Sequence, residues 1–219
     1  MKDKVFVKIC GVTDPANARM AVEMGAEMVG INFYPGSPRC VDVDRARDIV
    51  SAARDGRTGL LSVGVFVNMP IDEVLEIEAQ VGLELVQFSG DEPPEYVARF
   101  ADRGIKVFRT GGDPGAEELA RWKRSWAWLF DAPHRALRGG TGSAWDYGSI
   151  ADVARGDRDR IVFVAGGIGP DNVRHAIEAS RPRVVDVCSR VESSPGIKDP
   201  ELLRQLFQEV RNAQSETPP

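Results

Sequence analysis

The sequence predicts an α/β protein built as a single-domain (β/α)8 TIM barrel over residues 1–219. Three observations predict this fold. Short β-branched runs alternate with longer charged amphipathic runs along the whole chain, the short runs are almost continuously apolar, and eight such pairs fit into 219 residues. Strands without polar alternation are buried on both faces, which is typical of a parallel sheet. Pairs of about 27 residues suit a compact barrel of this kind.

Eight runs rich in Val, Ile, Leu and Phe are predicted to be strands. They cover residues 5–10, 28–33, 60–66, 83–88, 105–109, 127–131, 161–165 and 184–188. A doubly wound open sheet is the competing arrangement, but it usually has fewer strands and a glycine fingerprint after the first one. Here the first strand runs into Gly11, Val12 and Thr13 without a GxGxxG motif, which favours the barrel.

Eight amphipathic runs that follow the strands are predicted to be helices. They cover residues 15–24, 44–53, 71–81, 94–102, 116–123, 147–154, 171–179 and 200–210. Asp14 and Asp199 each precede a proline, which is an N-cap signal followed by proline at the first helical position. Gly25, Gly82 and Gly104 stand where helices are expected to end. Residues 212–219 are polar and are expected to form a frayed tail.

Composition excludes several classes of protein. Apolar residues make up 42% and charged residues 28% of the chain, which is ordinary for a globular protein and excludes a fibrous or disordered one. The net charge of −5 gives no overall attraction to nucleic acid or to anionic lipid. No apolar run is long enough to span a membrane, and the N-terminal residues do not resemble a signal peptide. We therefore expect a cytoplasmic protein that binds neither nucleic acid nor membranes.

The cysteines argue against a metal site. Cys10, Cys40 and Cys188 are far apart and form no CxxC pair, and the chain has only two histidines, His134 and His175. This spacing offers no zinc site and predicts reduced thiols.

Glycine-rich loops late in the chain predict a phosphate site. Gly140 and Gly142 follow the sixth strand, Gly166 and Gly167 follow the seventh, and Ser189 with Arg190 follows the eighth. Glycine lets backbone amides approach an anion, and the last loops of this fold often bind phosphate. Tight turns without a ligand are the alternative interpretation.

Two strand ends carry residues suited to acid–base chemistry. Cys10 ends the first strand and Asp131 ends the sixth, and in this fold the strand ends surround the active site. A thiol and a carboxyl group that face one cavity could divide the roles of base and acid. Lys8 lies on the same face of the strand as Cys10 and would lower the pKa of the thiol if its side chain approached. A buried small side chain and a helix cap are the alternatives for Cys10 and Asp131.

Sequence motifs add a family resemblance. They occupy residues 8–11 (KICG), 37–39 (SPR), 63–68 (VGVFVN), 86–92 (VQxxGDE), 139–142 (GGTG), 165–167 (AGG) and 186–199, which ends in VESSPGxKD. In this order they resemble the phosphoribosylanthranilate isomerase family. The resemblance implies a barrel without cofactor or metal that performs an Amadori rearrangement in tryptophan biosynthesis.

The resemblance also implies roles for individual residues. Cys10 matches the general base and Asp131 the general acid, which must hold a proton near neutral pH. Arg39 matches the residue that binds the anthranilate carboxylate, and a guanidinium fork suits that planar group. Asp186 matches an aspartate near the site, for which we expect an orienting hydrogen bond. The matching glycines and Ser189 are implied to hold the substrate phosphate; they are Gly140, Gly142, Gly166 and Gly167.

Two positions depart from the family pattern. Ser89 stands where the family usually has histidine, and Arg190 stands where it usually has glycine. We expect Arg190 at the phosphate end of the site, with its side chain near the anion or across the cavity mouth. These departures keep two alternatives open: an isomerase of another phosphorylated aminosugar, or a non-catalytic phosphosugar-binding barrel. The expected partner is a small phosphorylated substrate, and the chain is expected to be a monomer or a homodimer.

Overall fold

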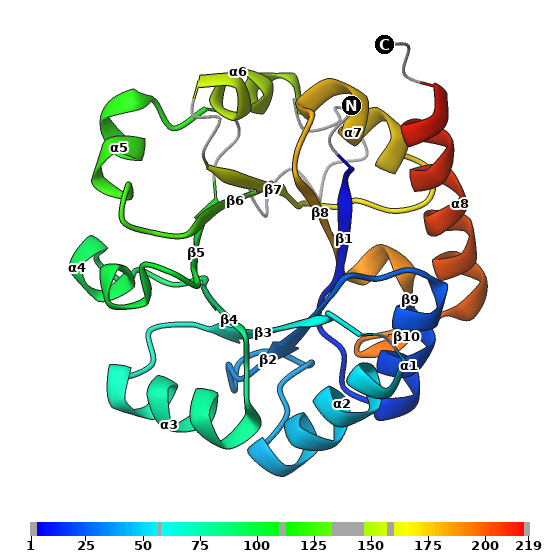
Figure 1. The fold of residues 1–219 in the computed structure, drawn as a ribbon, viewed down its shortest axis with the longest axis horizontal. Helices are drawn as coiled ribbons and strands as arrows, with labels where there is room; N and C mark the ends of the chain where they lie inside the picture. Colours follow the sequence, from blue (N-terminus) through cyan, green and yellow to red (C-terminus); the bar gives the residue numbers. More distant parts are fainter. Residues whose placement is uncertain (1–3, 57, 110–112, 133–146, 157–159, 217–219) are drawn as a thin grey trace.

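The computed structural model describes residues 4–56, 58–109, 113–132, 147–156 and 160–216. Eight parallel strands close into a barrel in the order β1 to β8, and helices surround it (Figure 1). The predicted (β/α)8 barrel is therefore confirmed. The strands are β1 (Phe6–Ile9), β2 (Met28–Asn32), β3 (Leu61–Phe66), β4 (Leu85–Phe88), β5 (Gly104–Arg109), β6 (Ala127–Asp131), β7 (Ile161–Val164) and β8 (Val184–Val187).

A helical segment follows each strand, in agreement with the predicted alternation. The α-helices are α1 (Pro15–Met24), α2 (Val43–Gly56), α3 (Ile71–Val81), α4 (Pro94–Val97), α5 (Ala116–Arg121), α6 (Gly148–Gly156), α7 (Val173–Ser180) and α8 (Pro200–Glu216). Four of the five expected caps form, at Asp14, Gly25, Gly82 and Asp199, whereas Gly104 is not a helix cap and instead begins β5. The Asp14 carboxylate accepts hydrogen bonds from the amides of Ala16 and Asn17, and Gly82 ends α3 in the left-handed conformation. None of the described helices is long and apolar enough to cross a membrane.

Apolar side chains fill two separate regions. Inside the barrel, Met28, Val63, Leu129 and Phe163 belong to one cluster. A larger cluster lies between the strands and the surrounding helices and includes seven buried phenylalanines. Both faces of the strands are therefore buried, as the apolar strand runs predicted.

Three elements differ from the prediction. The fourth helix is only one turn long and continues as a 3-10 turn, η1 (Ala98–Phe100). Helix α8 extends to Glu216, so the predicted tail is helical over residues 212–216; Ala213 is buried, and the Gln214 side chain donates to the Val5 carbonyl. A short hairpin that we did not predict, β9 (Glu192–Ser194) with β10 (Ile197–Lys198), lies between β8 and α8.

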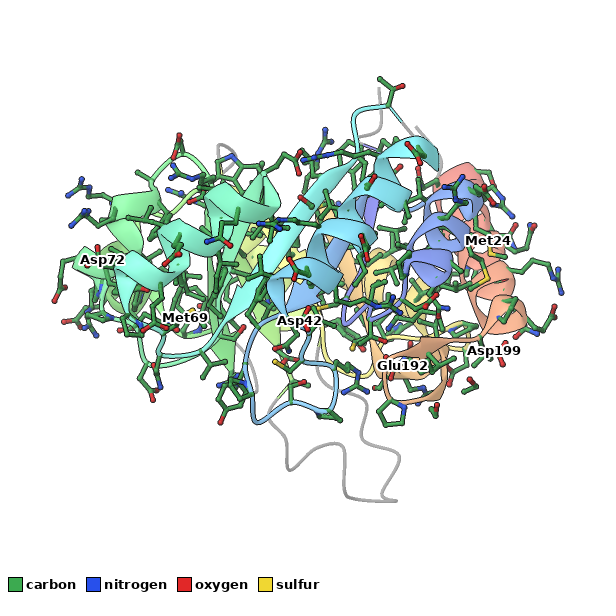
Figure 2. The ribbon with its side chains drawn as sticks, turned by 90° about the horizontal axis from the view of Figure 1, so that it is seen from below. Met24, Asp42, Met69, Asp72, Glu192 and Asp199 are labelled. Atoms are coloured by element: carbon green, nitrogen blue, oxygen red, sulfur yellow. The ribbon has the colours of Figure 1, made fainter. Side chains whose placement is uncertain are left out.

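The barrel closes where its first and last strands meet. The pairing runs in register from Phe6 opposite Val184 to Ile9 opposite Val187. A 3-10 turn, η3 (Ser189–Val191), then leads from β8 into the hairpin. Figure 2 shows Glu192 of this hairpin toward the same edge of the barrel as Asp42 and Met69, which follow β2 and β3. The hairpin thus lies toward the end of the barrel where the strands terminate, outside the ring of strands and beside α1 (Figure 1).

Candidate active site

A cavity of about 530 Å³ opens at the C-terminal ends of the strands. This is the end of the barrel at which active sites of this fold occur. The cavity is within the range that small ligands occupy. The predicted residues Cys10, Arg39, Asp131, Gly166, Gly167, Asp186 and Ser189 all line it. Gly140, Gly142 and His134 lie outside the described residues.

A buried hydrogen-bonded chain forms the floor of the cavity. The fully buried Lys8 ammonium donates to Asp186 Oδ2 at 2.9 Å and to Gln87 Oε1 at 2.8 Å. The Gln87 amide in turn donates to Ser89 Oγ at 3.1 Å. Burial alone would lower the pKa of Lys8, but Asp186 and Cys10 together raise it, so the residue stays charged. The other carboxylate oxygen, Asp186 Oδ1, is buried and has no hydrogen-bond partner among the described residues.

Cys10 lies beside this cation. Its pKa is lowered to about 7, first by a hydrogen bond from Cys188 and then by the charges of Lys8 and Lys198, against the opposing effects of burial and Asp186. A thiol with this pKa is largely deprotonated at slightly alkaline pH and can act as a base. Lys8 thus meets the condition stated above, since its charge acts on the thiol and lowers the pKa of Cys10.

Arg39 is held by the hairpin. Its Nε lies 2.9 Å from Glu192 Oε1 and its Nη2 lies 2.5 Å from Glu192 Oε2, so the contact is a two-point ion pair. Glu192 is only 4% exposed and also accepts from the buried Lys198 at 2.8 Å. Burial would raise the pKa of Glu192, but hydrogen bonds from Arg39 and Lys198 lower it. Glu192 therefore fixes the Arg39 side chain at the rim of the cavity.

Asp131 is the last residue of β6, in register with Arg109 at the end of β5. Its side chain is partly buried and lines the cavity. Two strands, β7 and β8, separate β6 from β1 in the barrel. Asp131 and Cys10 therefore approach the cavity from different sides, as an acid and a base acting on different atoms require.

The turn after β7 has the geometry of an anion site. Gly166 and Gly167 both have positive φ, 94° and 65°. A Cβ on Gly166 would lie 2.4 Å from Ala132 Cβ, so no larger residue fits there. Neither glycine amide donates to an acceptor in the part of the chain that the structure describes. These amides are available to a ligand in the cavity.

Contrary to the prediction, the side chain of Arg190 does not reach the cavity. Its guanidinium instead forms a two-point ion pair with the exposed Asp171, with both oxygens 2.6 Å from Nη2. Arg190 is not among the residues with positive φ, so the backbone accommodates an arginine at this position without strain. Asp171 lies in the turn before α7, two residues ahead of Val173, and its carboxylate pairs with the guanidinium there. His175 is exposed on α7.

Sequence reasoning missed three supporting residues: Cys188, Glu192 and Lys198. The last two lie within the motif that carried the resemblance, but no spacing rule connects them to Arg39 or Cys10. Cys188 could have been found because it follows the strand that closes the barrel next to Cys10. Among the described residues, no three His, Cys, Asp or Glu side chains are grouped so that they could hold a metal ion.

The fold and the cavity define the class of protein: a (β/α)8 barrel that presents acid–base side chains to a small molecule. The sequence profile described as N-(5'-phosphoribosyl)anthranilate (PRA) isomerase matches residues 7–209. The chain belongs to this family.

Individual relatives are similar to this chain over nearly its whole length. The N-(5'-phosphoribosyl)anthranilate isomerase of Rubrobacter xylanophilus is 41% identical, covering 94% of this chain and 98% of that protein. The one from Syntrophomonas wolfei is 40% identical, with 94% and 97% covered. The crystal structure of phosphoribosyl anthranilate isomerase from Thermotoga maritima superposes with a TM-score of 0.83 at 35% identity, covering 95% of this chain and 99% of that one.

A further solved structure contains a ligand. It is phosphoribosyl anthranilate isomerase in complex with reduced 1-(o-carboxyphenylamino)-1-deoxyribulose 5-phosphate, with a TM-score of 0.79 and 32% identity over 95% of this chain and 99% of that one.

Proposed function

We propose that this chain isomerises N-(5'-phosphoribosyl)anthranilate to 1-(2-carboxyphenylamino)-1-deoxyribulose 5-phosphate. The observation that carries the proposal is the presence of Cys10, Asp131 and Arg39 around one cavity, with the Gly166–Gly167 turn in the same wall. The family membership and the ligand in the related complex support this choice of substrate.

The first step opens the sugar ring. The protonated Asp131 carboxyl group donates its proton to the furanose ring oxygen, and the bond between that oxygen and C1 breaks. The anthranilate nitrogen supplies the electron pair, so C1 and nitrogen form a protonated Schiff base. General acid catalysis of this kind typically contributes about 10²–10⁴-fold.

The second step moves a proton from carbon. The Cys10 thiolate removes the proton from C2 of the Schiff base, and the C2 electron pair neutralises the iminium nitrogen to give an enolamine. The enolamine tautomerises to the ketone when C1 gains a proton and the C2 hydroxyl loses one. Substrate and product are isomers, so the reaction needs no cofactor.

Other residues orient the substrate. Arg39 uses Nε and Nη2 to contact Glu192, which leaves Nη1 without an acceptor among the described residues and available to the anthranilate carboxylate. The unpartnered Asp186 Oδ1 can accept a hydrogen bond from a sugar hydroxyl or from the anilino N–H. The phosphate is assigned to the amides after β7 and to Ser189, with Gly140 and Gly142 expected to complete that site.

A turnover assay tests the proposal. Freshly formed phosphoribosylanthranilate is fluorescent, and its loss on addition of the protein reports isomerisation. We expect enzymatic loss with the unmodified chain and none above background with a Cys10→Ala, Asp131→Asn double variant. Loss of fluorescence on another phosphorylated aminosugar alone would favour a different isomerase, and binding without turnover would favour a phosphosugar-binding barrel.

We also propose that the enzyme acts in the cytoplasm, as a monomer or a homodimer. The three cysteines are far apart in the sequence and form no CxxC pair, which suits a reducing compartment. Light scattering after size-exclusion chromatography measures the mass of the particle and distinguishes 23.9 kDa from twice that value.

A further inference from the structure

Cys10 has a second thiol as its neighbour across the closure of the barrel. Ile9 pairs with Val187, and the next residues on the two strands are Cys10 and Cys188. The Cys10 amide donates to the Val187 carbonyl at 2.8 Å, so the parallel pairing continues to this level. Both cysteines line the cavity. The two thiols therefore meet the same ligand space from adjacent strands.

One buried cation fixes the backbone of both cysteines. Lys198 Nζ donates to the Cys10 carbonyl at 2.6 Å and to the Cys188 carbonyl at 3.3 Å. The Lys198 side chain is completely buried, and Glu192 balances its charge. Because one ammonium group holds both carbonyls, the separation of the two strand ends is set by the fold rather than by a ligand.

The sulfur atoms of the two cysteines each pack against a glycine. A Cβ built on Gly30 would lie 2.8 Å from Cys10 Sγ, and one built on Gly11 would lie 3.0 Å from Cys188 Sγ. Each sulfur thus fills space that a larger residue would occupy. This close packing restricts the rotation of both thiols at the closure of the barrel.

We propose that Cys188 is a positioning residue whose S–H group donates a hydrogen bond to Cys10 Sγ and so stabilises the thiolate form of the base. The inference rests on the proposed function because it takes Cys10 as that base. Cys188 contacts the base and does not itself exchange a proton with the substrate.

The charges around the pair decide which thiol loses its proton. Lys8 contacts Cys10, whereas the hydrogen bond with Cys10 and burial both raise the pKa of Cys188. Cys188 therefore keeps its proton and can donate it as a hydrogen bond. The charged groups that act on the pair are Lys8 from β1, Arg39 from the loop after β2, Asp186 from β8 and Lys198 from β10.

The size of the effect follows from the thiolate fraction. A hydrogen bond to a charged group is typically equivalent to about one to two pKa units. Without the Cys188 donor, the pKa of Cys10 would rise from about 7 toward 8 or 9. At pH 7 the thiolate fraction, and with it kcat, would fall about five- to fiftyfold.

Replacing Cys188 with alanine or serine tests the proposal, because alanine removes the donor and serine keeps one. All variants carry Cys40→Ala, which removes a thiol outside the cavity and serves as the matched control. The first readout is the rate of Cys10 carbamidomethylation by iodoacetamide against pH, followed by mass spectrometry of the Cys10 peptide. The second is the pH profile of kcat with phosphoribosylanthranilate, with KM measured separately.

We expect C188A to move both profiles about one to two pH units toward alkaline pH with little change in KM, and C188S to stay near the control. If C188A and the control coincide in the alkylation profile, the proposal is wrong. It is also wrong if C188S is impaired as much as C188A and the loss is in KM, since that would indicate packing alone. If C188A does not fold, Cys188→Thr and Cys188→Val provide a similarly shaped pair with and without a donor.

The two readouts separate this inference from the proposed function. Absence of turnover in the unmodified chain would refute the function and leave the alkylation result intact. A C188A alkylation profile identical to the control, with normal turnover, would refute only the role of Cys188.

Discussion

Replacement of the Lys8 ammonium group, as in Lys8→Met, should destabilise the whole barrel. Lys8 is fully buried and donates to Asp186 at 2.9 Å, while Asp186 is 8% exposed. Methionine fills similar space but leaves the Asp186 carboxylate without its counter-ion. Removing one partner of a buried ion pair typically costs about 3–5 kcal/mol in free energy of unfolding. For a domain of this size that corresponds to a fall in Tm of about 6–20 °C.

The matched control is Lys4→Met, the same substitution four residues earlier. Lys4 is 54% exposed and lies 2.7 Å from Glu27, so its ion pair is at the surface. Such pairs contribute about 0–1 kcal/mol, and we expect a correspondingly small change. A third protein, Lys8→Met with Asp186→Leu, removes both charges and should recover much of the lost stability, because an apolar pair can replace a buried ion pair at little cost.

Urea unfolding at pH 7, followed by far-UV circular dichroism, gives the free energy of unfolding for all three proteins and the unmodified chain. The argument fails if Lys8→Met loses no more stability than Lys4→Met. It also fails if adding Asp186→Leu to Lys8→Met brings no recovery, since the uncompensated charge would then not be the cause.

The remaining predictions concern catalysis and the departures from the family pattern. Cys10→Ala and Asp131→Asn should each lower kcat about 10²–10⁴-fold with the fold intact by circular dichroism, and wild-type turnover in either variant would contradict its assigned role. Activity of the unmodified enzyme should fall as the pH drops through about 7, where the Cys10 thiolate takes up a proton; a kcat that is flat from pH 6 to pH 8 would exclude this base. Arg39→Ala should raise KM about 10–150-fold because a charge-assisted contact to the carboxylate is lost, and an unchanged KM would indicate a substrate without that group. Arg190→Gly should leave kcat and KM within about twofold, since the guanidinium pairs with Asp171 at the surface; a large rise in KM at low salt would instead assign it to the phosphate.

Local sequence signals were sufficient to predict much of the fold. Helices α1 and α3 and strand β6 begin and end at the predicted residues, because their caps and apolar periodicity act within a few positions. Helix α4 is shorter than predicted although it starts at Pro94 as expected. Its amphipathic pattern does not distinguish an α-helical second turn from a 3-10 turn that buries Phe100.

The site was only partly predictable because its contacts join distant parts of the chain. The strand-end rule identified Cys10 and Asp131 as candidates, and the resemblance supplied Arg39. The pairing of Arg39 with Glu192 spans 153 residues and depends on a hairpin that has no strong strand signal. The contact of Arg190 with Asp171 likewise depends on how two consecutive loops fold over the barrel end, which no local propensity determines.

The pairing of β1 with β8 has a consequence for the order of biosynthesis and folding. The base and Lys8 are made among the first residues of the chain, but the other groups that tune the base come from the last third: Asp186 is 178 residues from Lys8, and Lys198 is 188 residues from Cys10. Contacts of such high sequence separation form late, after the intervening loop has been closed. A nascent or truncated chain that ends before β8 therefore carries Cys10 as an ordinary, weakly acidic thiol. The appearance of a rapidly alkylated Cys10 near neutral pH marks the moment at which the barrel closes, so the enzyme becomes reactive only once its fold is complete.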